Sequence, residues 1–189
     1  MRLFAAVTPP PEAREELRRH VGAAASAGPE RLRWTDPDDW HVTLAFYGEV
    51  PPERVAELCT RLGRAAHRHA PLELSVRGVG RFGDRVLWAG VTGDRPAVEG
   101  LRRLADAAKA AGRRAGAPVD DAHRYHPHLT LARARGDVRL APLVERLADF
   151  DGATWAAEEV QLVHSTLPRS GVPGERPRHE LLESWPLTG

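Results

Sequence analysis

The sequence contains a single cysteine, Cys59, and a single lysine, Lys109, among its 189 residues. One cysteine excludes any disulfide within the chain, and a chain without disulfides suits a reducing compartment. Because almost all of its basic residues are arginines, we interpret the arginine content mainly as a bias of composition. Arginine is nonetheless well suited to phosphate recognition.

Long hydrophobic runs are also missing. No apolar stretch approaches the length that spans a membrane. The apolar residues 3–7 end at Thr8, which three prolines follow, so this run is too short for the core of a signal peptide and indicates a first strand instead. We therefore expect a cytoplasmic protein that has no membrane partner.

The chain has no excess of charge of either sign, since 27 Lys+Arg residues stand against 26 Asp+Glu residues and leave a formal net charge of +1. Such a balance creates no overall field that would attract a polyanion, so any affinity for RNA must come from a local patch. The hydrophobic content of 42% and the charged content of 28% are ordinary for a globular protein with a substantial core.

Several well-known sequence fingerprints are absent. There is no P-loop and no dinucleotide-binding glycine motif, which disfavours nucleotide triphosphates and adenylylation-driven ligation. No serine stands in a Gly-x-Ser-x-Gly turn, so a serine hydrolase has no support. Cys59 lies on the apolar face of a predicted helix, and we expect it in the core rather than as a nucleophile.

The sequence does contain one short motif that occurs twice. His41-Val42-Thr43-Leu44-Ala45 and His128-Leu129-Thr130-Leu131-Ala132 share the pattern His-x-Thr-Leu-Ala. In a β-strand alternate side chains share a face, so each copy presents an imidazole and a hydroxyl over an apolar underside. A single copy would most simply be a strand with one surface histidine. Two copies facing each other would instead form one site with two histidines and two threonines.

This combination of side chains is suited to phosphate chemistry with an acid and a base. Imidazole titrates near neutral pH, so one ring can accept a proton while the other donates one. A threonine hydroxyl two residues further along can donate a hydrogen bond to a phosphoryl oxygen. The paired motifs therefore predict a phosphate site that performs proton transfer.

The paired motifs resemble those of the 2H phosphoesterases, and their flanks are similar to one branch of that superfamily. Arg33-Trp34 before the first motif, residues 46–50 after it, and residues 127–133 around the second resemble the RNA 2',3'-cyclic phosphodiesterases, historically named 2'-5' RNA ligases. The resemblance extends over nearly the whole chain. It implies hydrolysis of RNA 2',3'-cyclic phosphate ends to 2'-phosphate ends. We expect no cofactor and, because the sequence shows no evident metal-binding constellation, no metal.

The resemblance also implies a role for each motif residue. His41 would be the proton donor and His128 the proton acceptor, while Thr43 and Thr130 would bind the substrate phosphate. The near-symmetry of the two motifs does not by itself assign the acid and the base.

The order of predicted strands and helices mixes the two types without regular parallel βαβ units, which indicates an α+β fold. No linker divides the chain, so we expect residues 1–189 to form a single bilobal catalytic domain, acting as a monomer. The resemblance implies a pseudo-twofold arrangement of two antiparallel sheets facing across a central groove with helices outside. Residues 168–177 are rich in proline, glycine and arginine and are predicted to form a loop.

Other side chains could contact RNA in such a groove. Aromatic rings stack on the bases of single-stranded RNA, and Tyr47 continues the groove-facing alternation of the first motif, whereas Trp34 and Trp88 fit the core slightly better. His126 shares the face of His128, while Arg133 falls on the opposite face unless a β-bulge intervenes. The candidate RNA contacts are Tyr47, Arg33, Arg81, Arg124 and His126.

The histidines allow an alternative interpretation as metal ligands. His41, His126 and His128 could form a metal site, but the sequence shows no evident further ligand or carboxylate partner. His179, on a terminal strand, is expected to be solvated.

Alternative activities are 2'-5' RNA end joining by the reverse reaction, action on cyclic phosphates of small nucleotides, or non-catalytic RNA binding. The complete His and Thr pairs argue against the last.

Overall fold

The computed structural model describes residues 1–168 and 176–189, so the centre of the loop predicted for residues 168–177 lies outside the described residues. The predicted α+β class is confirmed. The elements follow in chain order as β1 (Arg2–Val7), α1 (Pro11–Ala27), β2 (Leu32–Trp34), a 3₁₀ turn (Pro37–Asp39), β3 (Val42–Glu49), α2 (Pro52–Ala66), β4 (Leu72–Phe82), β5 (Val86–Thr92), α3 (Arg95–Arg114), β6 (His128–Ala134), α4 (Ala141–Leu147), β7 (Trp155–Ala157), β8 (Glu159–Thr166) and β9 (Arg178–Pro186).

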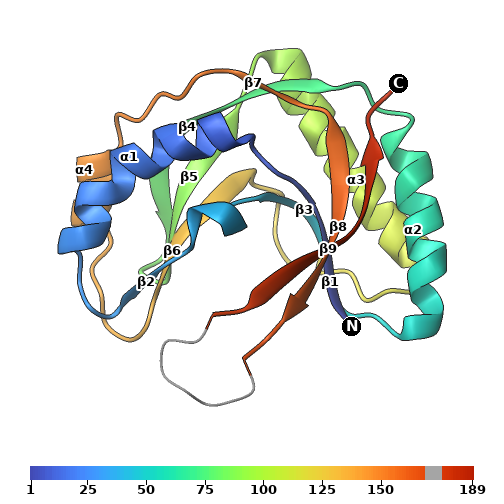
Figure 1. The fold of residues 1–189 in the computed structure, drawn as a ribbon, viewed down its shortest axis with the longest axis horizontal. Helices are drawn as coiled ribbons and strands as arrows, with labels where there is room; N and C mark the ends of the chain where they lie inside the picture. Colours follow the sequence, from blue (N-terminus) through green and yellow to red (C-terminus); the bar gives the residue numbers. More distant parts are fainter. Residues whose placement is uncertain (169–175) are drawn as a thin grey trace.

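The strands form one curled, antiparallel sheet with the order β7-β4-β5-β6-β3-β1-β8-β9 (Figure 1). β2 pairs with residues 132–134 of β6, beyond the point where β6 pairs with β3. The two sheets expected from the resemblance are therefore joined edge to edge. The joint between them is narrow, because β3 and β6 pair only at Val42 and Leu129. One half of the sheet contains β2 and β4 to β7, and the other contains β1, β3, β8 and β9.

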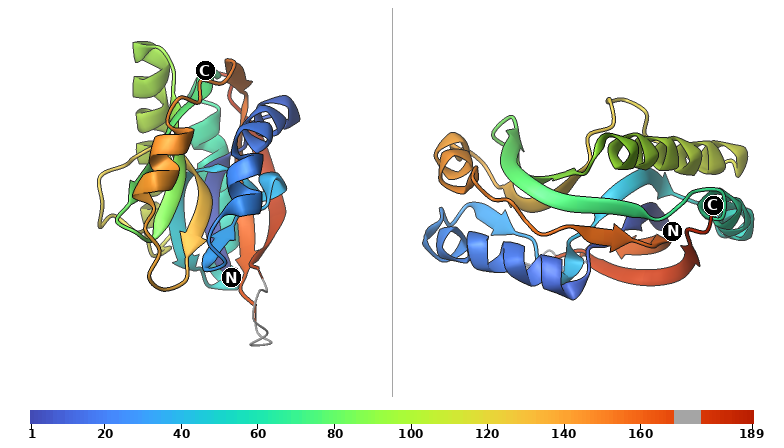
Figure 2. Two further views of the ribbon diagram at one scale, coloured as in Figure 1. Left: turned by 90° about the vertical axis from the view of Figure 1, so that its left-hand side faces the viewer. Right: turned by 90° about the horizontal axis from the view of Figure 1, so that it is seen from above.

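The helices lie outside the curled sheet, as predicted (Figures 1 and 2). α1 packs beside α4. α2 and α3 pack together, with α2 against β8 and β9 and α3 against β3 and β4. Asp94 caps α3, because its carboxylate accepts a hydrogen bond of 2.8 Å from the amide of Ala97. Within the described residues, no helix is both long and apolar enough to cross a membrane.

The two central strands contain matching β-bulges. Leu44 is an extra residue of β3 opposite β1, and Leu131 is an extra residue of β6 opposite β5. Each is the leucine of a His-x-Thr-Leu motif. Because one extra residue reverses the alternation of side chains, Phe46 and Arg133, each two places further on, face the same side as the motif histidines.

The bulge at Leu44 also corrects the prediction for Tyr47. Its ring was expected in the groove but is fully buried in the core, where its hydroxyl donates a hydrogen bond of 2.9 Å to the carbonyl of Ala108 on α3. The prediction was wrong because strict alternation was extended through the bulge. Tyr47 therefore anchors β3 to α3 and cannot contact RNA.

Candidate active site

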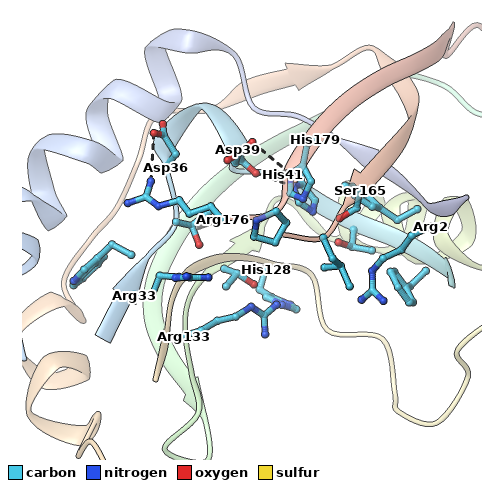
Figure 3. Close-up of a pocket in the computed structure, with 18 residues that line it drawn as sticks. Arg2, Arg33, Asp36, Asp39, His41, His128, Arg133, Ser165, Arg176 and His179 are labelled. Carbon is cyan, nitrogen blue, oxygen red and sulfur yellow. Dashed lines mark hydrogen bonds and ion pairs between the residues drawn. The ribbon is translucent and has the colours of Figure 1, made fainter. Parts of the chain in front are cut away.

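A cavity of about 460 Å³ opens at the joint between the two halves of the sheet (Figure 3). Both motifs contribute to it, so the structure brings His41, Thr43, His128 and Thr130 together as the sequence predicts. The other lining residues are Arg2, Phe4, Arg33, Trp34, Thr35, Asp36, Asp39, Phe46, Arg133, Ser165, Leu167, Arg176, Pro177 and His179.

The two histidine rings are held in the same way. Nδ1 of His41 donates a hydrogen bond of 2.7 Å to the carbonyl oxygen of Asp39, and Nδ1 of His128 donates one of 2.6 Å to the carbonyl oxygen of His126. Because a carbonyl oxygen only accepts, the proton of each neutral ring resides on Nδ1. Nε2 of both rings is thereby left to exchange a proton with a substrate.

Burial makes both rings poor bases in the protein alone. It lowers the pKa of His41 to about 4, and His179, His128 and Arg133 act in the same direction, against the opposing effect of the bond to Asp39. Burial likewise lowers the pKa of His128, with smaller contributions from His126 and Arg133. Both imidazoles are therefore mainly neutral at pH 7 in the protein alone.

The ring of His41 is packed between two aromatic neighbours. Phe4 stacks on it with ring centroids 4.5 Å apart, and His179 meets it edge-on at 5.4 Å. Nδ1 of His179 lies 3.4 Å from the carboxylate of Asp39, the residue whose backbone carbonyl holds His41 (Figure 3). The expectation that His179 is solvated was wrong, because β9 folds back against β8 and places this side chain in the wall of the cavity.

Arginines surround the cavity. Arg33 on β2 and Arg133 on β6 are directly opposite partners across the strand pair, and both line the site. Like charges in directly opposite positions of a sheet repel, so an anion between or beside them would stabilise the arrangement. Arg176 is paired with Asp36 at 3.5 Å, and the guanidinium of Arg2 lies 4.6 Å from the centre of the Phe46 ring.

Three predicted RNA contacts lie elsewhere. Arg81 is on the β4–β5 hairpin, where it pairs with Asp84 at 3.2 Å and does not line the cavity. Arg124 and His126 line a separate hollow next to His128. These three side chains therefore do not lie in the single groove that the sequence predicts.

Several lining residues were not singled out by the sequence. Strict alternation places Arg133 on the face opposite His128, and the bulge at Leu131 brings it into the cavity. Phe46 and His179 gave no signal of their own, although the equivalence of Phe46 to Arg133 in the two motifs could have indicated it.

Within residues 1–168 and 176–189, no three His, Cys, Asp or Glu side chains gather as a metal-binding group.

A curled antiparallel sheet that carries two His-x-Thr motifs in one cavity defines the class of two-histidine phosphoesterases. Residues 6–168 match the family model described as the 2'-5' RNA ligase superfamily. The chain belongs to this superfamily.

Curated relatives and a solved structure agree with this assignment. A protein of Geobacillus stearothermophilus named RNA 2',3'-cyclic phosphodiesterase is 30% identical over 98% of the chain, which spans 57% of that relative's length. A protein of Thermus thermophilus with the same name is 32% identical, with 100% of this chain and 91% of the relative covered. The structure of E. coli LigT complexed with 3'-AMP is 30% identical, has a TM-score of 0.77, and covers 100% of this chain and 98% of its own.

Proposed function

We propose that the chain hydrolyses RNA 2',3'-cyclic phosphate ends to 2'-phosphate ends, and that residues 1–189 act as one catalytic domain. The observation that carries the proposal is the equivalent placement of His41 and His128 in one cavity, each with Nδ1 bonded to a carbonyl and Nε2 available. The names of the relatives support the same activity, and the 3'-AMP bound by E. coli LigT is a ribose phosphate of similar chemistry.

In the proposed reaction the anionic cyclic phosphate accepts hydrogen bonds from the hydroxyls of Thr43 and Thr130, while Arg33 and Arg133 balance its charge. Nε2 of His128 takes a proton from water as the water oxygen bonds to phosphorus. The bond between phosphorus and the 3' oxygen breaks, and Nε2 of His41 gives that oxygen its proton. The products are a 2'-phosphate and a 3'-hydroxyl, and the roles of the two histidines follow the family resemblance.

The acid role of His41 requires a proton that the protein alone does not supply. With a pKa of about 4, His41 is neutral at pH 7. An anion within a few ångströms favours the charged imidazolium and raises this pKa. We therefore propose that the substrate phosphate itself drives protonation of His41 as it binds.

The direct test is an assay with a short RNA that ends in a 2',3'-cyclic phosphate, run in the presence of a chelator because we propose metal-independent catalysis. His41→Ala and His128→Ala should each lower kcat by roughly 10²- to 10⁴-fold. The double variant should be little worse than either single one, since groups that act together are not additive. His69→Ala is the matched control, because Nδ1 of His69 also bonds a backbone carbonyl, that of Ala65, but lies outside the cavity.

An active His128→Ala protein would overturn the assignment. Activity that collapses with the chelator and returns with zinc or manganese would replace it with a metal mechanism. A 3'-phosphate as main product would reverse the orientation of the substrate while leaving the two-histidine chemistry in place.

End joining to a 2'-5' linkage is the reverse of the same reaction and needs no further groups. Adding an RNA with a 5'-hydroxyl to the assay would reveal it as a longer product. A monomeric state and a cytoplasmic location stay predictions, which sedimentation and cell fractionation would check.

A further inference from the structure

A second hollow of about 570 Å³ lies next to His128 and is lined by residues of β4, β5, α3 and the segment 124–127. Aromatic and arginine side chains line it as they line the cavity, but Asp36 and Asp39 line the cavity whereas no carboxylate is among the described residues that line the hollow. It is lined by Arg77, Phe82, Trp88, Gly90, Val91, Thr92, Val98, Arg102, Arg124, Tyr125, His126 and Pro127.

Aromatic rings connect this hollow to the catalytic histidine. Phe82 meets the ring of His128 edge-on, with centroids 5.0 Å apart, and meets His126 at 5.6 Å. His126 in turn contacts Trp88 at 4.6 Å. The rings therefore form a continuous surface that begins at the proposed catalytic site.

The hollow lies on the same face of the sheet as the cavity. Trp88 on β5 is directly opposite Thr130 on β6, and opposite residues of a strand pair project to the same face. The indole lies across the neighbouring strand, where a Cβ atom on Gly80 would be 2.3 Å from it. Glycine at position 80 thus lets Trp88 lie along the sheet instead of standing out from it.

The charge of the hollow is positive. Among the described residues that line it there are three arginines and no carboxylate. Arg77 is paired with Asp151 at 2.8 Å, whereas Arg102 and Arg124 are exposed and make no ion pair within the described part of the chain. Phe82 is an exposed large hydrophobic side chain, with 41% of its surface accessible.

Exposed rings interleaved with arginines are the features that bind single-stranded nucleic acid, since bases stack on the rings and phosphates pair with the arginines. We propose that this hollow binds the single-stranded RNA segment on the 5' side of the nucleotide that carries the cyclic phosphate. The inference rests on the proposed function, because the terminal nucleotide in the cavity fixes where the segment begins. The RNA then runs from His128 across β5 and β4 toward Arg102 and Arg124.

The test compares a 2',3'-cyclic mononucleotide with a tetranucleotide that has the same end. The unaltered protein should have a kcat/KM at least roughly 5-fold higher for the tetranucleotide, the smallest gain expected from one stacked base. The double variant Arg102→Ala/Arg124→Ala, and separately Phe82→Ala, should reduce this ratio toward 1. Arg103→Ala is the control for Arg102→Ala, because it removes one positive charge from the adjacent position of α3 but does not line the hollow, and it should leave the ratio unchanged.

A binding measurement makes the outcome independent of catalysis. Anisotropy of a fluorescein-labelled single-stranded RNA ending in a 2'-phosphate should show weaker binding by the double arginine variant. The slope of log affinity against log salt concentration should be less steep by about 1.4 for this variant than for the unaltered protein. Each phosphate contact on a single strand contributes about 0.7, and two contacts are removed.

Different results would contradict the inference and the proposed function. If the mononucleotide and tetranucleotide are hydrolysed equally well by the unaltered protein, this hollow does not bind the RNA, although the activity stands. If neither is hydrolysed, the proposed function fails and anisotropy alone decides about the hollow. Equal RNA binding by the unaltered protein and the double arginine variant would overturn the inference in either case.

Discussion

At the scale of single residues, the site is defined by two half-buried, neutral imidazoles, each hydrogen-bonded through Nδ1 to the carbonyl two residues before it. Their hydrogen bonds to the carbonyls of Asp39 and His126 fix the tautomer, and burial keeps the proton off Nε2 at neutral pH. Neither ring is therefore charged to a large extent in the protein alone, and the proposed function requires that the bound phosphate favour the charged form of one of them.

This leads to a prediction about proton uptake. Binding of a 2'-nucleotide to the protein at pH 7 should take up a fraction of a proton, because an anion next to His41 raises its pKa from about 4. Calorimetric titration in buffers of different ionisation enthalpy measures this uptake. His41→Gln should reduce it strongly, whereas equal uptake by this variant would mean that another group receives the proton.

The two threonines give a second prediction at this scale. Thr43→Val or Thr130→Val removes one hydrogen bond to a charged oxygen and should cost about 1.5–3 kcal/mol in kcat/KM for the cyclic phosphate. Steady-state kinetics of each variant checks this value. A loss as large as that of the histidine variants would mean that the threonines do more than bind phosphate.

At the scale of the elements, the paired bulges explain what could and could not be predicted from the sequence. The histidines and threonines precede Leu44 and Leu131, so alternation predicted their common face correctly. Beyond each leucine the alternation reverses, which moved Tyr47 into the core and brought Arg133 into the cavity. One extra residue in a strand leaves no mark in the sequence pattern, because it becomes visible only when the partner strand is known.

The helices were predictable for the opposite reason, since their pattern depends on their own sequence. Breaks such as Gly28 and apolar spacing such as that of Leu58 and Leu62 on α2 indicate a helix and its buried face without any partner. His179, in contrast, is part of the site only because β9 pairs with β8 and returns to the cavity. Long-range pairing of this kind is not encoded in a local pattern.

The contact between β3 and α3 gives a prediction for Gly112. A Cβ atom there would lie 2.5 Å from Cε1 of Tyr47, so Gly112→Ala should lower the free energy of unfolding by about 1–3 kcal/mol. Gly22→Ala is the control, because its Cβ would meet nothing within 4 Å on α1, and the change should stabilise the protein by up to about 1 kcal/mol. Urea unfolding of both variants tests the pair, and an unaffected Gly112→Ala protein would contradict the packing described here.

At the scale of the whole molecule, the depressed histidine pKa values couple folding to pH. The folded protein keeps His41, His128 and His179 neutral because burial lowers their pKa values. In the unfolded chain a histidine takes up a proton below about pH 6.5. The stability due to the neutral rings is therefore complete above pH 6.5 and is lost as the pH falls from 6.5 toward the folded values.

For His41 this predicts a loss of about 1–2 kcal/mol in the free energy of unfolding between about pH 7.5 and pH 5. Urea denaturation at the two pH values measures the difference. His41→Phe retains a ring against Phe4 but cannot be protonated, so its loss over the same interval should be smaller by that amount. An identical pH dependence of the two proteins would show that His41 is not kept neutral by folding.

The narrow joint between the halves of the sheet has a mechanical consequence. Val42 and Leu129 form the single residue pair between β3 and β6, and each directly follows a proposed catalytic histidine. The backbone spacing of the two histidines is therefore set by this one strand contact together with α3, which packs against both β3 and β4 and so links the two halves.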